Sequence, residues 1–172
     1  LNTLAFSICF ACWTLNGVLV TFLVDKGIFN WSVVEVGWLL GIPILSGAIF
    51  RLPIGILTDK YGGKIIFSVL LFLCSIPLFL LPFADTFWSF AVLSFLFGLV
   101  GTSFAVGIGY TSVWYPQNWQ GRALGIFGMG NAGAAITTFM APTLLNRFSE
   151  SDPINGWKML PITYASVLVS IG

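Results

Sequence analysis

The chain has 172 residues, of which 58% are hydrophobic and only 8% are charged, and its formal net charge is +1. A soluble domain carries about 25% charged residues, so this chain has too little polar surface to cover a water-soluble globule. The small net charge, without any basic run, excludes a nucleic-acid-binding surface, and the lack of histidine removes the commonest metal ligand.

Six apolar stretches follow one another along the chain, and a transmembrane helix needs about 20 such residues. In chain order they cover residues 3–24, 36–58, 65–84, 87–113, 123–146 and 159–172. The sixth stretch stops short, so we expect a truncated last helix. The links between the stretches are short, which makes neighbouring helices antiparallel. The sequence therefore predicts an all-α membrane protein, a bundle of about six transmembrane helices that run up and down.

Three cysteines lie within these apolar stretches. Cys9 and Cys12 form a C-x-x-C spacing, and Cys74 stands alone. No second pair accompanies them and no nearby cation would lower their pKa, so we interpret them as small buried hydrophobic residues rather than redox or metal-binding groups. No nucleophile–base pair or phosphate-binding loop is present either. We expect no catalytic residue, no metal site, no cofactor and no enzyme activity.

Arg51 is the only charged residue inside the second stretch, and the stretches contain no other charge. It lies 8 residues before Asp59, or about 12 Å from that membrane surface at 1.5 Å per residue. All the acids lie in loops or at span ends, so Arg51 has no evident counter-ion. Its planar guanidinium suits a planar oxyanion. Two alternatives remain: Arg51 extends to the surface, or it braces the Ile49 carbonyl that Pro53 leaves free.

The fifth stretch is rich in glycine and contains one amide side chain, Asn131. Its glycines allow a close approach either by a neighbouring helix or by a ligand, and both interpretations stay open. A second helix with small residues at a spacing of four, Gly101 to Gly109, is a candidate packing partner. Asn131 lies 9 residues after Arg122, about 13 to 14 Å from the surface, so it is matched in depth to Arg51.

The segment 55–64 reads Gly-Ile-Leu-Thr-Asp-Lys-Tyr-Gly-Gly-Lys. It resembles the signature of the major facilitator superfamily, Gly-x-x-x-Asp-Arg/Lys-x-Gly-Arg-Arg/Lys, between spans 2 and 3. Gly63 departs from the pattern, since a basic residue is usual there. The resemblance implies that loops 59–64 and 114–122 are cytoplasmic and that Asp59, Lys60 and Lys64 belong to a gate. A solvated loop is the alternative interpretation of these charges.

Three further segments resemble the nitrate/nitrite porter (NarK-type) family. Residues 123–135, Ala-Leu-Gly-Ile-Phe-Gly-Met-Gly-Asn-Ala-Gly-Ala-Ala, resemble its span 5 signature, residues 50–53, Phe-Arg-Leu-Pro, resemble its span 2, and residues 104–116 resemble its span 4 and the loop after it. The resemblance implies that Arg51 grips the anion and that Asn131 donates a hydrogen bond to it. The backbone at Gly128 and Gly130 would make room for the anion, and Phe10 and Trp13 are candidates for an aromatic wall.

We therefore expect residues 1–172 to form the N-terminal, six-helix half of a multi-pass inner-membrane transporter. Its partners would be nitrate or nitrite, the lipid bilayer and a C-terminal half with a second arginine. Alternating access about a midplane site would move the anion. Two alternatives remain: a facilitator for another small anion such as a carboxylate, and a membrane subunit or fragment that transports nothing.

Overall fold

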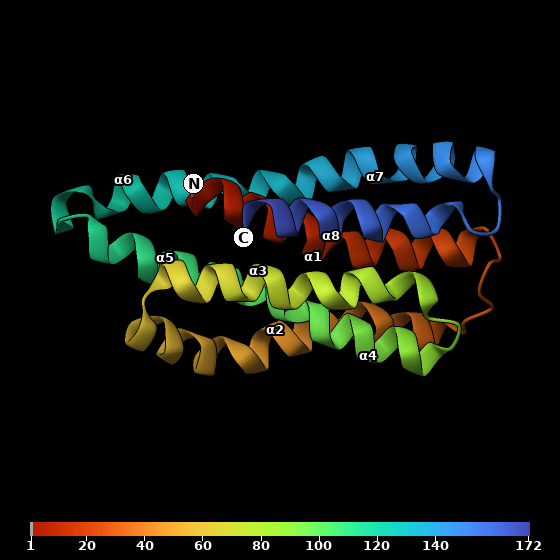
Figure 1. Ribbon diagram of the computed structural model, residues 1–172, viewed down its shortest axis with the longest axis horizontal. Helices are drawn as coiled ribbons and strands as arrows, with labels where there is room; N and C mark the ends of the chain where they lie inside the picture. The colour runs from red at the N-terminus through yellow and green to blue at the C-terminus, as the bar shows by residue number, and fades with distance from the viewer. Residues whose placement is uncertain (1) are drawn as a thin grey trace.

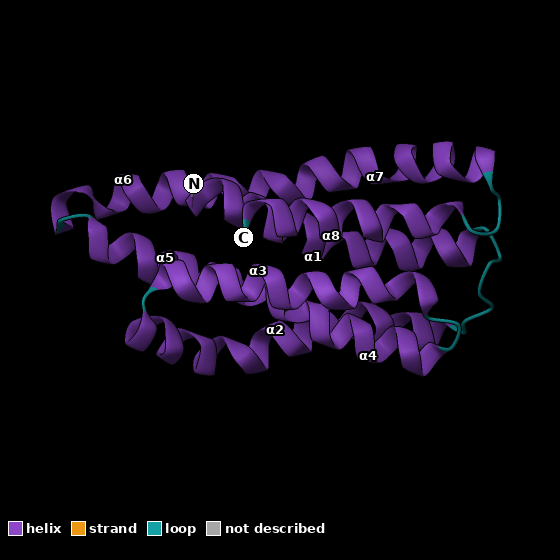
Figure 2. Ribbon diagram, viewed as in Figure 1, coloured by secondary structure: helices purple, strands orange, loops and turns teal. Residues whose placement is uncertain are grey.

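The computed structural model describes residues 2–172 and is helical almost throughout (Figures 1 and 2). No strand occurs within these residues, so the predicted all-α fold is confirmed. The elements are α1 (Asn2–Asp25), α2 (Val33–Tyr61), α3 (Gly63–Leu80), η1 (Leu81–Phe83), α4 (Phe87–Gly98), η2 (Leu99–Thr102), α5 (Ser103–Trp114), α6 (Gln117–Gly128), η3 (Met129–Asn131), α7 (Ala132–Ser151), η4 (Gly156–Lys158) and α8 (Met159–Ile171).

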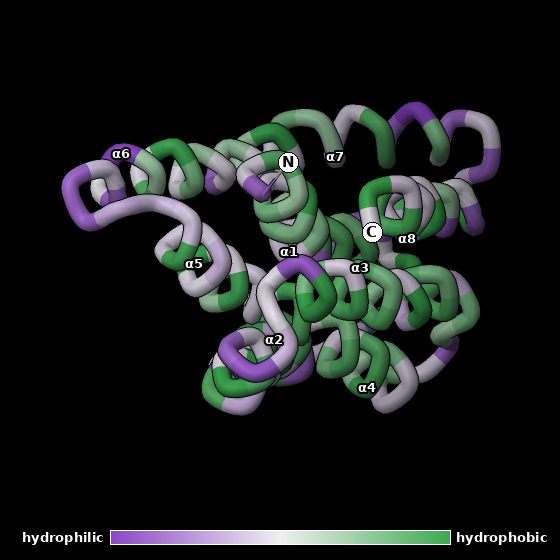
Figure 3. Tube along the Cα trace, turned by 60° about the vertical axis from the view of Figure 1, so that its left-hand side comes forward, coloured by the Kyte–Doolittle hydropathy of each residue, from purple (hydrophilic) through white to green (hydrophobic). Residues whose placement is uncertain are grey.

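Short 3-10 turns join α4 to α5 and α6 to α7, so each pair forms one long rod. Counted this way, five rods are long and apolar enough to cross a membrane, and α8 is a shorter sixth helix. Figure 3 shows hydrophilic residues gathered at the turns between helices and apolar residues along their lengths. The observed helices extend past several of the predicted spans, most of all at α6, which begins at Gln117 rather than at residue 123.

Local sequence explains where the helices begin and end. Ser32 and Glu35 form a capping box at the start of α2, and Thr86, the N-cap residue of α4, forms one with Ser89. Gly62 separates α2 from α3 with a φ of 87°, a conformation that favours glycine. These ends turn the chain tightly, so the helices run alternately in opposite directions along the bundle.

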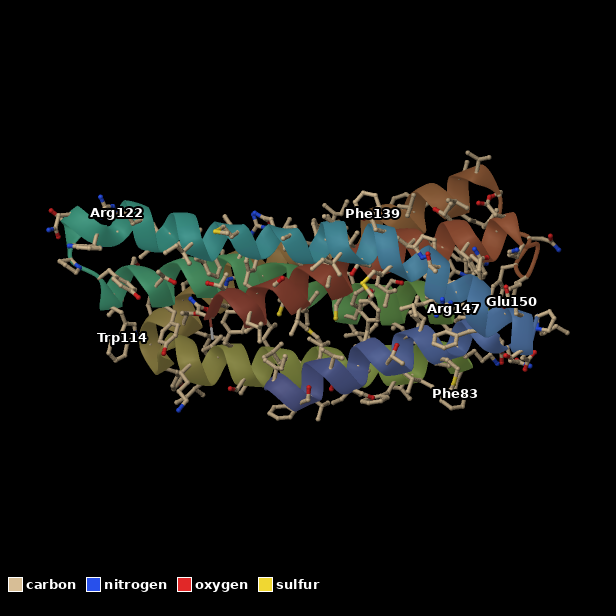
Figure 4. The ribbon with its side chains drawn as sticks, turned by 90° about the horizontal axis from the view of Figure 1, so that it is seen from above. Phe83, Trp114, Arg122, Phe139, Arg147 and Glu150 are labelled. Carbon is tan, nitrogen blue, oxygen red and sulfur yellow. The ribbon has the colours of Figure 1, made fainter. Side chains whose placement is uncertain are left out.

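The α2–α3 turn and the α5–α6 turn lie at one end of the bundle (Figure 1). The α1–α2, α3–α4 and α7–α8 connections lie at the other. Figure 4 shows Trp114 and Arg122 at the first end and Phe83, Arg147 and Glu150 at the second. The five connections between the rods therefore lie at the two ends of the bundle, two at one end and three at the other.

In the bundle, α1 runs between α2 and the α6–α7 rod and packs against both. On another side α3 packs against α8, and α4 packs against both α2 and α3. The three cysteines are free and completely buried in the core, as predicted for small hydrophobic residues.

One predicted packing partner is wrong. Gly101 and Gly109 do not face the fifth rod: Gly101 lies against Gly47 of α2, and Gly109 lies near Thr58 of the same helix. The contact between the fourth and fifth rods is made instead at Gly107, whose backbone leaves space for the ring of Phe127. The spacing of small residues indicated a close helix contact but did not identify the helix.

Candidate anion-binding face

Arg51 lies on an exposed part of α2. Among residues 2–172 it forms no ion pair and no hydrogen bond, so it does not brace the free Ile49 carbonyl. On the same side of the helix, Gly55 lies one turn further on, and a methyl group added there would meet no atom within 4 Å. The guanidinium therefore stands beside open space and keeps its hydrogen-bond donors available.

Asn131 occupies an equivalent environment on the fifth rod. It is exposed at the end of η3, and its Nδ2 donates to the Gly128 carbonyl at 3.0 Å. A primary amide carries two N–H groups, so one donor is left for another partner. Nothing lies within 4 Å of a methyl group added at Gly128. Asn131, like Arg51, thus has a glycine and open space beside it.

The two faces that carry these side chains border the same stretch of α1. A groove of 290 Å³ between α1 and α2 is lined by Gly17, Leu40 and Ile44, and Ile44 lies two turns from Arg51 on one helix face. A groove of 360 Å³ between α1 and α7 is lined by Gly17 and Thr138, which lies two turns from Asn131. Gly17 lines both grooves. The arginine and asparagine faces therefore flank α1 from its two sides.

Contacts along α1 fix the level of Arg51 in the bundle. Gly101 lies against both Gly47 and Trp13, which places these two residues at one level. Arg51 follows Gly47 by one turn toward the α2–α3 end, and Phe10 is one turn from Trp13 toward the same end. One turn is about 5.4 Å, so Arg51 and Phe10 lie at about the same level.

Contacts of the fifth rod fix the level of Asn131 in the same way. Gly130 lies against Phe6, and Gly133 lies against Ser7. Asn131 falls between these glycines, within about one turn of Phe10 along the bundle axis. Arg51, Phe10 and Asn131 therefore lie within about one helical turn of one another in depth.

The aromatic candidates of α1 are half-buried. The Phe10 ring lies 5.1 Å from the ring of Phe6 and 5.3 Å from that of Trp13, measured between centroids. Phe104 extends this aromatic cluster with a centroid distance of 5.7 Å to Phe6. Phe104 is not among the aromatic residues predicted for this wall, although its place at the start of segment 104–116 is the signal that could have suggested it. The indole Nε1 of Trp13 is buried without a hydrogen-bond partner among the described residues.

The glycines of the fifth rod divide into two groups. Gly130 and Gly133 are buried against α1, and a methyl group at Gly130 would lie 2.5 Å from Cδ1 of Phe6. Close packing of α1 therefore accounts for these two. Gly121, Gly125 and Gly128 have no atom within 4 Å of an added methyl group. Both sequence interpretations thus apply, helix packing at one group and open space at the other.

The three charged residues of the expected gate are all exposed near the α2–α3 turn. Asp59 and Lys64 line a cavity of 510 Å³ together with Tyr110 and Trp114 of α5. Lys60 lies outside that lining, with its Nζ 5.2 Å from the centroid of the Tyr61 ring. None of the three forms an ion pair with another described residue.

The sequence over residues 1–171 matches the family model of the Major Facilitator Superfamily. The chain belongs to this superfamily. Its long apolar helices are therefore membrane spans, and the superfamily membership that the sequence predicted is confirmed.

Several relatives of the chain carry names that refer to nitrate or nitrite. The chain is 40% identical over 177 residues to the "Probable nitrate/nitrite antiporter NarK1" of Thermus thermophilus, an alignment that covers all of this chain and 40% of the relative. It is 28% identical over 163 residues to the "Nitrite extrusion protein" of Bacillus subtilis, and 28% identical over 172 residues to the "Probable nitrate transporter NarT" of Staphylococcus aureus. These alignments cover 95% and 100% of this chain and 41% and 44% of the relatives. The chain thus spans about two fifths of the length of the relatives that it matches.

Proposed function

We propose that this chain is the N-terminal half of a transporter that moves nitrate, nitrite or both across the inner membrane by alternating access. The observation that carries the proposal is that Arg51 and Asn131 are placed in matching positions on two different helices. Both stand unobstructed at about one depth, on two helix faces that flank α1. Relatives named for nitrate or nitrite transport align with the whole chain, which supports the choice of anion.

In this mechanism Arg51 supplies the charge and Asn131 the orientation. An anion that leaves water for the middle of the bilayer loses its hydration shell, and a guanidinium with two parallel N–H donors offsets part of that loss. The free N–H of Asn131 adds a third donor, and Gly128 leaves room beside it. Phe10 and Trp13 form the apolar wall from α1. Gly130 packs against Phe6, so in this proposal it makes no contact with the anion.

The site needs a second half to enclose it. In the most apolar part of each rod, 22% of the residues of α2 and 28% of those of α6–α7 are buried, against 44% or more in the other three rods. The two helices that carry Arg51 and Asn131 are thus the most open of the five. A C-terminal half placed against them would close the site and supply the second arginine that the family resemblance implies.

The charged turn at residues 59–64 belongs to the cytoplasmic side in this proposal, together with the 114–122 turn. Asp59 and Lys64 would make or break contacts with the second half as the transporter changes state, with Lys60 beside them. The cavity that Asp59 and Lys64 line lies at this end of the bundle, where such contacts would form.

Uptake by the full-length transporter in proteoliposomes tests this function. We expect labelled nitrate to accumulate, unlabelled nitrate and nitrite to compete, and formate or acetate to compete weakly. Strong competition by the carboxylates would instead favour a facilitator for small carboxylates. The absence of uptake of any of these anions by protein that is folded and correctly inserted would favour a membrane subunit that transports nothing.

A further inference from the structure

Pro43 interrupts the hydrogen bonding of α2 at a buried place. Proline has no backbone N–H, so the carbonyl of Leu39, four residues earlier, loses its helical partner. Leu39 is completely buried, so water cannot replace that partner. A carbonyl left unpaired at such a site destabilises the fold, and a group from another helix has to satisfy it.

Asn16 of α1 supplies this group. Its Nδ2 donates to the Leu39 carbonyl at 2.8 Å, and its side chain is only 3% exposed. On the other side of the amide, Ser94 of α4 donates from Oγ to the Asn16 Oδ1 at 3.1 Å. Ser94 is fully buried. The three residues therefore link α1, α2 and α4 through one polar network, which we call the Asn16 lock.

Pro53, the second proline inside α2, has no such partner. The Ile49 carbonyl that it leaves free accepts no hydrogen bond from the described residues outside its own helix turn. Between the two prolines, Gly47 packs against Gly98 and Gly101. The part of α2 that precedes Arg51 is thus fixed to its neighbours by the Asn16 lock and this contact. Within residues 2–172, no side chain from another helix forms an equivalent hydrogen bond to the part of α2 that follows Arg51.

We propose that Asn16 is a positioning residue for the anion site, which it serves through α2. By satisfying the Leu39 carbonyl that Pro43 leaves free, Asn16 fixes the course of α2 at its first proline, and this sets where the Arg51 face stands relative to Phe10 and Asn131. The inference rests on the proposed function, because it assigns Asn16 a role in that site. Asn16 itself lies six residues after Phe10, about 9 Å further toward the opposite end of α1, so in this proposal it acts through α2 and not by touching the anion.

A suppressor experiment in the full-length transporter tests this role. The variant Asn16→Leu removes the donor at similar volume, and we expect the KM for nitrate to rise about tenfold with less than about a twofold change in kcat. Adding Pro43→Ala restores an N–H within the helix that can bond the Leu39 carbonyl. We expect the double variant to recover a KM within about threefold of the parent protein. The single variant Pro43→Ala is the matched control.

Ser94→Ala gives an independent and milder perturbation, with an expected rise in KM of about threefold. If Asn16→Leu does not fold, the KM of Ser94→Ala still tests the proposal. Hydrogen–deuterium exchange of peptides that cover residues 33–50 provides a readout without substrate: exchange should speed up in Asn16→Leu and slow again in the double variant.

Two results would overturn the proposal: an unchanged KM in both Asn16→Leu and Ser94→Ala, or an Asn16→Leu defect that Pro43→Ala does not relieve. Failure of the proposed function gives a different pattern. In that case the parent protein takes up no nitrate, while hydrogen exchange still reports whether the lock holds α2.

Discussion

The backbone of Gly133 lies directly against the backbone carbonyl of Ser7, and a methyl group at Gly133 would overlap that carbonyl. This contact brings α7 and α1 together at the level of the proposed site. It also explains why the fifth rod tolerates glycine, a poor helix former, at this point: the energy lost in helix propensity is offset by close helix packing.

Gly133→Ala should therefore destabilise the full-length protein. Forcing a methyl group into a packed backbone contact costs about 1–3 kcal/mol. We expect a lower melting temperature in detergent and a smaller monodisperse fraction. Gly125→Ala is the matched control, because its methyl group enters open space and improves helix propensity. Equal melting temperatures for the two variants would show that the α1–α7 contact is looser than described.

Gly128→Leu should separate binding from folding. Open space surrounds Gly128, so the larger side chain should leave the melting temperature nearly unchanged. It would fill the room beside Asn131, and we expect the KM for nitrate to rise by at least about fivefold, a change of about 1 kcal/mol. Gly125→Leu, one turn away on the same rod, should leave the KM as it is. A normal KM in Gly128→Leu would place the anion elsewhere.

Asn131→Asp should weaken nitrate uptake more than Asn131→Gln. The aspartate has the same size but loses the free N–H and adds a negative charge next to the anion. A hydrogen bond to a charged group contributes about 1.5–3 kcal/mol, so the KM should rise about 10- to 100-fold. The glutamine keeps an amide donor and should cost less. Equal KM values for the two variants, measured in proteoliposomes, would argue against an Asn131 contact with the anion.

Asp59→Asn should change transport rate rather than affinity. Asp59 lies at the α2–α3 turn, far along α2 from Arg51. Removing its charge should alter the contacts with the second half that form and break as the transporter changes state, and should leave contacts to the anion unchanged. We expect a reduced maximal uptake rate with nitrate binding, measured by calorimetry on purified protein, unchanged. Lys60→Gln should have a smaller effect, because Lys60 does not line the cavity that Asp59 lines. A matching loss of binding affinity in Asp59→Asn would contradict a gating role.

The bundle itself could be predicted from sequence because each rod is an apolar run of membrane-spanning length. Arg51 could be singled out because burying a charge without an acidic partner in such a run is energetically unfavourable, so a charge at this depth indicates a function. Helix ends were less predictable. The α6 helix begins at Gln117, where the polar residues around Arg122 lower the hydropathy while still favouring helix.

The contacts between helices could not be predicted. Glycine spacing in the fourth rod indicated close packing, but only the structure showed that Gly101 meets Gly47 of α2. The role of Asn16 was also hidden, since its partner Leu39 is 23 residues away and becomes a hydrogen-bond acceptor only because of Pro43. A sequence pattern shows which face of one helix is small, apolar or polar, whereas these contacts depend on which helices become neighbours.

The most direct measurement is the KM for nitrate of Arg51→Lys in the full-length transporter. Lysine keeps the positive charge but loses the planar pair of donors, so a two-point contact with the anion would become a single one. The account predicts a KM raised at least about tenfold, with expression and melting temperature preserved. Arg122→Lys, at the end of the bundle, should behave like the parent protein. A near-normal KM in Arg51→Lys would contradict the proposal that Arg51 binds the anion.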